Sequence, residues 1–306
     1  MPQIFAGLTH NSTIHRRLFF VIAALSAFAI TPPVYAENLA VSATESIAHE
    51  SIKADYHQST IEPDRITGEY VKEYFTDTGK ILASPANWNG SDWLKTGLVV
   101  GVATGIYLAD TDIRNIAQRN QNSTGDALAA IGNSLGNPLY TLPPLGLFYL
   151  YGHVTEDSKA RRTSLLAVES LAISGVLTWT IKLATQRPRP FTGESSNTWN
   201  GPTLKSTDTS FPSGHTTAAF SVASVIAEEY GSNPYVPPIT YSLATLTACA
   251  RIYDNKHWAS DAFFGGAIGY FVGKAVVRYH TQSNTGLIVL PTSTQHGLGL
   301  MAEYRF

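Results

Sequence analysis

Residues 127–155 contain no charged side chain, and prolines and glycines interrupt this apolar stretch twice. The interruptions are Gly136-Asn137-Pro138 and Pro143-Pro144. Because a proline inside a helix removes a backbone hydrogen bond and clashes with the preceding turn, one continuous membrane-spanning helix is disfavoured. The stretch instead predicts two shorter buried helices.

The later apolar segments are short or carry a polar residue at or near their ends. Glu169 and Lys182 flank one of them, and Asp261 lies inside the last. These segments are rich in Ala, Gly, Ser and Thr, which permits close packing of helices. The pattern predicts an all-α fold, a helical bundle over residues 91–281 that is soluble or loosely associated with a membrane.

The two ends of the chain differ from this helical domain. A pair of arginines, an apolar segment at 18–30 and a small-residue pattern at 34–36 predict that residues 1–36 are a secretory signal peptide, with an uncleaved anchor helix as the alternative. Residues 37–90 are polar and predict an extension with little catalytic content. In the tail, residues 282–306, apolar residues alternate with other residues, which predicts a short β-hairpin packed on the bundle.

Composition excludes several classes of partner. The net charge of −2 gives no support to nucleic-acid binding, and the single cysteine, Cys249, cannot form an intrachain disulfide or a cysteine metal cluster. No metal or cofactor is predicted, because the histidines outside the clusters described next lack ligand spacing with nearby carboxylates: His10, His15, His49, His57, His153, His280 and His296.

Three polar clusters occur at predicted helix ends. In the first, Lys182 lies in the last turns of a helix that Pro188 and Pro190 must end, and Arg189 follows in the extended exit. In isolation, cations at a helix C-terminus are also explained by a favourable interaction with the helix dipole.

The second cluster, Pro212-Ser213-Gly214-His215, opens a predicted helix. Ser213 can cap this helix, and Gly214 lets another group approach the backbone closely. Free N–H groups at a helix start attract an anion, and His215 in the first turn could donate a proton to a leaving oxygen. A plain capped helix with a surface histidine would explain the same residues.

In the third cluster, Arg251 ends one apolar helix and His257 opens the next, with Asp261 four residues later. Positions i and i+4 share a helix face, so Asp261 can accept the imidazole N–H and raise the basicity of the other ring nitrogen. Such a histidine is a candidate nucleophile. An isolated histidine–aspartate pair at this spacing, however, is more often a surface hydrogen bond.

Together the three clusters supply what phosphoryl transfer needs. Lys182, Arg189 and Arg251 could hold the phosphoryl oxygens without a metal, and a nucleophilic and an acidic histidine complete the set. In order along the chain, the clusters resemble the signature motifs of the type-2 phosphatidic acid phosphatase superfamily. That superfamily includes bacterial acid phosphatases, lipid phosphate phosphatases and vanadium-dependent haloperoxidases.

The matching motifs are Lys182-x6-Arg189-Pro190, Pro212-Ser213-Gly214-His215 and Arg251-x5-His257-x3-Asp261. The resemblance implies that His257 attacks phosphorus, that Asp261 orients it, and that His215 protonates the leaving group and later activates water. It also implies a phosphate-binding set made of Lys182, Arg189, Ser213, the Gly214 N–H and Arg251. Ala250 stands where the family often has serine, which removes one hydroxyl and leaves every charged participant.

The sequence therefore predicts an exported, periplasmic phosphatase that hydrolyses phosphomonoester or diphosphate bonds through a phosphohistidine. Lipid or isoprenoid phosphates are the favoured substrates, with peripheral membrane contact. The alternatives are a soluble acid phosphatase of broad specificity, a vanadium-dependent haloperoxidase and a non-enzymatic envelope protein. The segment Leu145 to Tyr151 either faces lipid or, as the prediction favours, belongs to the core.

Overall fold

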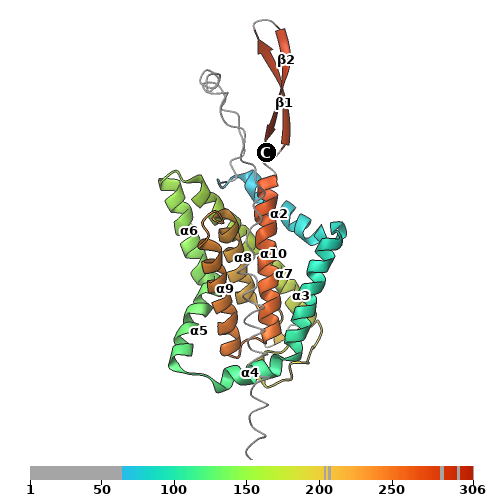
Figure 1. Ribbon diagram of the computed structural model, residues 1–306, viewed down its shortest axis with the longest axis vertical. Helices are drawn as coiled ribbons and strands as arrows, with labels where there is room; N and C mark the ends of the chain where they lie inside the picture. The colour runs from blue at the N-terminus through green and yellow to red at the C-terminus, as the bar shows by residue number, and fades with distance from the viewer. Residues whose placement is uncertain (1–63, 203–204, 206–207, 283–285, 295–296, 306) are drawn as a thin grey trace, which may run out of the picture.

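The computed structural model describes residues 64–202, 205, 208–282, 286–294 and 297–305, with backbone alone in the last two ranges. The predicted signal peptide and half of the predicted N-terminal extension, residues 37–63, lie outside these ranges. The described residues form a helical bundle, as predicted (Figure 1). Its helices are α2 (Gly68–Ala83), α3 (Gly90–Leu108), α4 (Asp110–Arg119), α5 (Ser123–Gly136), α6 (Pro138–Val154), α7 (Ser158–Thr185), α8 (Gly214–Glu229), α9 (Val236–Tyr253) and α10 (Ala259–Gln282).

Beyond α10 the backbone continues as two antiparallel strands, β1 (Gly286–Thr294) and β2 (Gly297–Arg305), with Leu290 opposite Met301. The side chains of both strands lie outside the described residues. The fold class therefore rests on the helices, and a hairpin packed on the bundle stays a prediction of the sequence.

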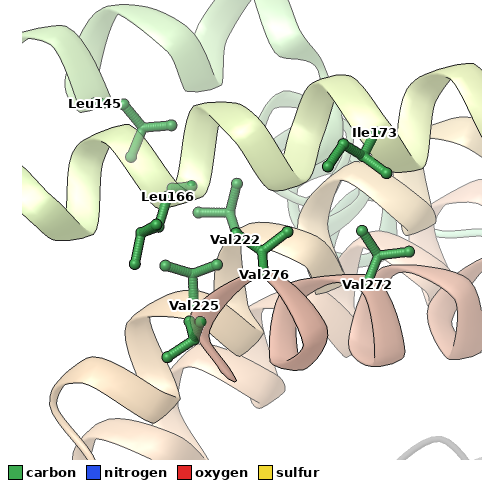
Figure 2. Packing of buried hydrophobic residues seen from close by; sticks show 9 residues of the cluster. Leu145, Leu166, Ile173, Val222, Val225, Val272 and Val276 are labelled. Atoms are coloured by element: carbon green, nitrogen blue, oxygen red, sulfur yellow. The ribbon is translucent and has the colours of Figure 1, made fainter. Parts of the chain in front are cut away.

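Helix α8 lies at the centre of the bundle, in contact with α5, α7, α9 and α10. Almost every residue from Thr216 to Ala227 is buried. Figure 2 shows the apolar core that α8 forms with α6, α7 and α10, in which Val222 and Val225 meet Leu145, Leu166, Ile173, Val272 and Val276. These branched side chains remove apolar area from water on the face of α8 that carries Val222 and Val225, which holds the helix in place.

Three glycines spaced by four residues let α10 approach the backbone of α8. A Cβ atom at Gly265 would lie 2.5 Å from the Ser213 carbonyl oxygen, and one at Gly273 would lie 2.7 Å from that of Ser221. A Cβ at Gly269 would overlap the carbonyl oxygen of Thr217. Such close packing through small residues brings the N-terminal ends of α8 and α10 together.

We expect Gly269→Ala to destabilise the protein by about 1–3 kcal/mol, because the added methyl must push α10 away from α8. Gly101→Ala in α3 is the matched control, since a Cβ at Gly101 meets nothing within 4 Å. The control should unfold at the wild-type temperature or slightly above, because alanine favours helix. Thermal unfolding of both variants measures the difference, and equal midpoints would contradict the packing argument.

Helix α6 differs from the sequence prediction in one respect. In α6, Pro143 and Pro144 lie inside one helix, so the apolar stretch is interrupted only at Asn137, whose side chain accepts from the Leu139 N–H at 3.0 Å.

The expectation that this apolar stretch is buried is wrong. Leu145 is buried, but Leu147, Leu150 and Tyr151 are each more than half exposed. Large apolar residues are also exposed elsewhere in this stretch and on other helices: Leu94, Leu98, Leu108, Leu128, Ile131, Leu139, Val154, Val176, Trp179, Ile239 and Leu243. An exposed apolar surface of this extent marks a site of contact with lipid or with another apolar surface.

Among the described residues, one helical segment is long and apolar enough to cross a membrane by length and composition. This segment is Ser158–Thr192, and half of its most apolar window is buried inside the bundle. Burial of that kind also occurs in the core helix of a soluble protein.

Candidate active site

His257 lies in the turn between α9 and α10, where it is buried. Its Nδ1 atom is 2.7 Å from the carbonyl oxygen of Ser210, so Nδ1 carries the proton and donates it to that carbonyl. The Nε2 atom then keeps its lone pair. Burial lowers the pKa of His257 to about 3, although its interaction with Asp261 raises it, so the ring is neutral near pH 7. A neutral imidazole with a fixed tautomer can act as a nucleophile.

Asp261 acts on His257 less directly than the i,i+4 spacing predicted. The distance from His257 Nδ1 to Asp261 Oδ2 is 3.9 Å, which is too long for a hydrogen bond. Asp261 Oδ2 instead accepts from the Ser210 hydroxyl at 2.5 Å and from the Trp258 N–H at 3.0 Å. Asp261 therefore fixes the segment that holds His257 as well as carrying a nearby negative charge.

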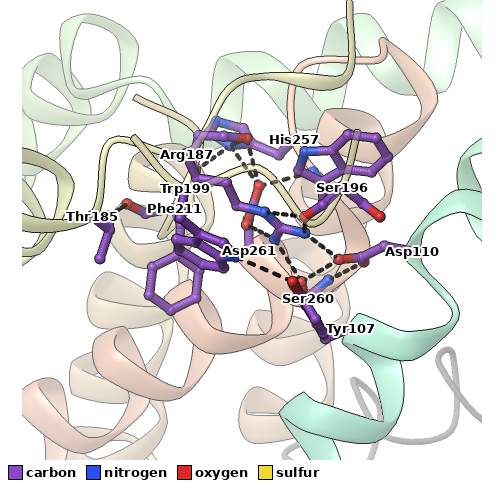
Figure 3. A network of polar contacts seen from close by, with 12 residues as sticks. Tyr107, Asp110, Thr185, Arg187, Ser196, Trp199, Phe211, His257, Ser260 and Asp261 are labelled. Atoms are coloured by element: carbon purple, nitrogen blue, oxygen red, sulfur yellow. Dashed lines mark hydrogen bonds and ion pairs between the residues drawn. The ribbon is translucent and has the colours of Figure 1, made fainter. Parts of the chain in front are cut away.

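Arg187 joins this network from the extended segment after α7, and the sequence did not single it out as a site residue (Figure 3). The side chain is fully buried; its Nη1 atom donates to Asp261 Oδ1 at 2.5 Å and its Nη2 atom to Asp110 Oδ2 at 2.7 Å. Asp110 also accepts from the backbone N–H of Ser260 at 2.9 Å. The first turn of α10 is thus tied to the first residue of α4.

Three aromatic rings surround the Arg187 guanidinium. The ring centroids of Tyr107, Trp199 and Trp258 lie 5.0, 4.9 and 5.4 Å from its Cζ atom. Rings at this distance stabilise a cation and exclude water. No local sequence signal marks Arg187, because its two carboxylate partners lie 77 and 74 positions away.

The three predicted cations gather beside this network. Lys182 Nζ donates to the carbonyl oxygen of Thr209 at 2.5 Å. Arg189 Nη2 donates to the hydroxyl oxygen of Thr209 at 3.1 Å. Arg251 Nη1 donates to Asn133 Oδ1 at 2.6 Å. Lys182, Arg189 and Arg251 are close enough to repel one another electrostatically.

The cation cluster has unused capacity for an anion. The Nε atoms of Arg189 and Arg251 are buried without a hydrogen-bond partner among the described residues. None of the ion pairs between described residues involves Lys182, Arg189 or Arg251. Since an unpaired buried charge is costly, the cluster is suited to a ligand with several negatively charged oxygens, such as a phosphoryl group.

Helix α8 begins at this cluster, as the sequence predicted. Ser213 is its N-cap, with a side chain that accepts from the Thr216 N–H, and Gly214 is its first residue. The Ser213 N–H donates to the carbonyl oxygen of Asp261 at 3.0 Å, which joins the starts of α8 and α10. The start of α8 therefore offers N–H groups and a positive dipole end to an anion.

A cavity of about 500 Å³ opens between α6, α7 and α8, and its walls are mainly apolar. Lys182, Gly214 and His215 line one part of it. The rest is lined by Pro138, Leu142, Val168, Leu171, Ala172, Ser174, Gly175, Thr178, Trp179, Thr217 and Ala218. The cavity thus places two of the predicted phosphate-binding residues, Lys182 and Gly214, beside an apolar groove along α6 and α7.

Comparison with known proteins matches residues 163–285 to the model of the PAP2 superfamily. Over 66 residues, 21% of this chain, the sequence is 46% identical to a lipid A 1-phosphatase from Porphyromonas gingivalis, and the matched segment spans 15% of that protein.

Two solved structures are similar at low identity. Aquifex aeolicus LpxE is 22% identical with a TM-score of 0.45, covering 56% of this chain and 95% of that one. A transmembrane PAP2-type phosphatidylglycerolphosphate phosphatase from Bacillus subtilis is 18% identical with a TM-score of 0.47, covering 69% and 96%. The match to the family model contains all of the predicted site residues, from Lys182 to Asp261.

Proposed function

We propose that this protein is a lipid phosphate phosphatase that works through a phosphohistidine at His257. The observation that carries the proposal is that Lys182 of the cation cluster, together with His215, lines one apolar cavity with Leu142 and Trp179. A phosphoryl group bound by the cations would leave an attached acyl or isoprenoid chain in the groove.

In the first step, the His257 Nε2 lone pair attacks phosphorus, and the bond from phosphorus to the leaving oxygen breaks. His215 gives its proton to that oxygen, so the alcohol leaves neutral and the phosphoryl group stays on Nε2. Lys182, Arg189 and Arg251, with Ser213 and the Gly214 N–H, hold the phosphoryl oxygens while charge develops on them.

In the second step, His215 takes a proton from a water molecule, whose oxygen attacks phosphorus. The bond from phosphorus to Nε2 breaks, inorganic phosphate leaves, and His257 regains its neutral state. The Ser210 carbonyl keeps the Nδ1 proton in place through both steps, since it accepts that proton at 2.7 Å.

The outer surface of the bundle supports a lipid substrate independently. Large exposed side chains on α3, α5, α6 and α9 would lie in lipid, and Trp179 at the groove would sit at its edge. The Porphyromonas gingivalis relative is a lipid A 1-phosphatase, which supports the same class of substrate. The signal-like segment at residues 1–36 supports export, with the active site on the periplasmic side.

The groove can be tested with two tryptophan substitutions. Gly175 lines the cavity beside Lys182 and His215, and Gly146 lines an adjoining apolar cavity of about 540 Å³ between α2, α6 and α7. A Cβ at either glycine meets nothing within 4 Å. We expect Gly175→Trp to lower kcat/KM for phosphatidic acid and lipid A 1-phosphate by about tenfold or more, because it fills the groove, whereas Gly146→Trp should not.

Hydrolysis of p-nitrophenyl phosphate by both variants should stay near the wild-type rate, since this short ester does not reach the groove. Wild-type protein should also prefer the lipid phosphates, assayed in detergent, to the short ester. Equal kcat/KM for both kinds of substrate, with no effect of Gly175→Trp, would instead favour a soluble phosphatase of broad specificity.

A further inference from the structure

A second polar cluster is buried at the end of the bundle opposite to His257. It joins His280 in the last turns of α10, Glu169 in α7 and Asp77 in α2. His280 lies nineteen positions after Asp261 along α10, which at the helical rise corresponds to about 28 Å. In Figure 1 the end of α10 and α2 lie together at this end, away from α4. The cluster is therefore separate from the phosphoryl-transfer site.

The ligand-type atoms of the cluster converge on His280 Nε2. This atom is 2.9 Å from Glu169 Oε2 and 3.4 Å from Asp77 Oδ2, and one ligand atom from each residue lies within 4.8 Å of the others. Glu73 Oε2 approaches from the other side of the ring, 3.6 Å from Nδ1. Glu169 is fully buried, and Asp77 and His280 are 3% and 4% exposed.

The charges of this cluster do not balance among the described residues. Three carboxylates, on Glu73, Asp77 and Glu169, surround one imidazole, and Lys80 pairs with Asp77 at 2.7 Å. With His280 neutral, Lys80 alone faces the two buried carboxylates, Asp77 and Glu169, because the Glu73 side chain is 33% exposed. A buried excess of negative charge is costly unless a cation neutralises it.

An unsatisfied oxygen also points to a missing ligand. Glu169 Oε1 is buried and has no hydrogen-bond partner among the described residues, while Oε2 of the same carboxylate accepts from Tyr70 at 3.2 Å and contacts His280. Glu73 Oε2 is likewise buried without a hydrogen-bond partner. Buried carboxylate oxygens are normally paired, so two unpaired ones in one cluster indicate room for a cation.

The spacing and the donor types fit a metal ion. Two ligand atoms that each lie about 2.0–2.2 Å from one ion are about 2.9–3.5 Å apart in octahedral or tetrahedral geometry. The separations of 2.9 and 3.4 Å around His280 Nε2 fall in this range. One imidazole nitrogen with carboxylate oxygens is a donor set suited to zinc or manganese. Tyr70 would orient Glu169 through its hydrogen bond.

We propose that Asp77, Glu169 and His280 bind a divalent transition-metal ion, Zn²⁺ or Mn²⁺. The ion would join α2 to α7 and α10 and would stabilise the bundle without taking part in phosphoryl transfer. The site could not be predicted from sequence spacing, because Asp77 and Glu169, the two ligands nearest in sequence, are 92 residues apart along the chain.

The test uses the full chain without an affinity tag, stripped with EDTA and then dialysed. Zn²⁺ or Mn²⁺ alone is added, with Mg²⁺ as a comparison, and bound metal is measured by mass spectrometry beside thermal unfolding. We expect about one equivalent of Zn²⁺ or Mn²⁺ and a rise in Tm of about 5 °C or more, because binding to the folded state stabilises it. Mg²⁺ should give a smaller effect.

Glu169→Gln and Asp77→Asn keep the size of each side chain but remove its charge, and each should abolish both the bound equivalent and the rise in Tm. Glu228→Gln is the matched control, since Glu228 pairs with Lys274 on the surface and should leave metal binding unchanged. Absence of a bound equivalent in wild-type protein would overturn the proposal. So would metal retained by both ligand variants, or a Tm that Zn²⁺ and Mn²⁺ do not change. If a variant fails to fold, the wild-type metal content and Tm still decide between these outcomes.

Discussion

Replacing His257 with alanine should reduce phosphate release by about 10⁴-fold or more, because no other described side chain can replace its Nε2 atom as nucleophile. The ring is held by the Ser210 carbonyl at 2.7 Å with Nε2 free, and the neighbouring cations would bring phosphorus to it. The rate on p-nitrophenyl phosphate and on phosphatidic acid measures the loss. Brief incubation of wild-type protein with labelled substrate should trap a phosphohistidine, which is stable to base and labile to acid.

His153→Ala is the matched control, since His153 is an exposed histidine at the end of α6. It should retain wild-type turnover and labelling. Thermal unfolding of His257→Ala should show a folded protein, so that the loss can be assigned to chemistry. Full activity in His257→Ala, or label trapped equally in that variant, would refute the proposed nucleophile.

Replacing Arg187 with lysine should have the second largest effect, on both stability and turnover. The guanidinium reaches Asp110 and Asp261 together, and both carboxylates are fully buried. A lysine keeps the charge but cannot present two pairs of donors in one plane, so one carboxylate would lose its partner. Loss of one partner of a buried ion pair costs about 3–5 kcal/mol.

Arg187 is a positioning residue, because it acts on His257 through Asp261 and Ser210. We therefore expect Arg187→Lys to lower kcat by about 10²-fold or more while KM changes little, since the phosphate-binding cations are untouched. Arg119→Lys is the control: Arg119 is exposed in the last turn of α4, and its replacement should change neither kcat nor Tm noticeably.

A double variant separates positioning from simple loss of stability. Adding Asp110→Asn to Arg187→Lys removes the charge of one buried carboxylate, which should recover part of the lost Tm. Turnover should stay low, because Asp261 still lacks its hydrogen bond from the Arg187 guanidinium. Recovery of kcat in step with Tm would show that Arg187 serves stability alone.

Much of the site could be predicted from sequence because its signals are local. Pro188 and Pro190 cannot continue a helix, so α7 ends close to Lys182, and its C-cap Gln186 adopts a left-handed conformation. Ser213 caps α8 because a serine hydroxyl satisfies a free N–H at a helix start. These short-range effects place each motif at a helix end regardless of the rest of the fold.

Burial could not be predicted in the same way. The apolar residues of α5 and α6 indicated a core, whereas Leu128, Ile131, Leu147 and Leu150 face outward. The small-residue helices α8 and α10 fill the interior instead, because glycine, alanine and serine let their backbones approach closely. Apolar composition identifies which residues avoid water, but it does not distinguish a protein interior from an apolar environment outside.

By itself, the amino-acid sequence determined the helices, their ends and the order of three motifs suited to phosphate. Only the tertiary structure decided which charges meet. Arg187 contacts Asp110 and Asp261, and His280 contacts Asp77 and Glu169. The members of each pair are 74 or more residues apart along the chain. The physical reason is that a buried charge must be compensated by whatever lies beside it in space. Sequence spacing carries that information only within a turn or a single helix.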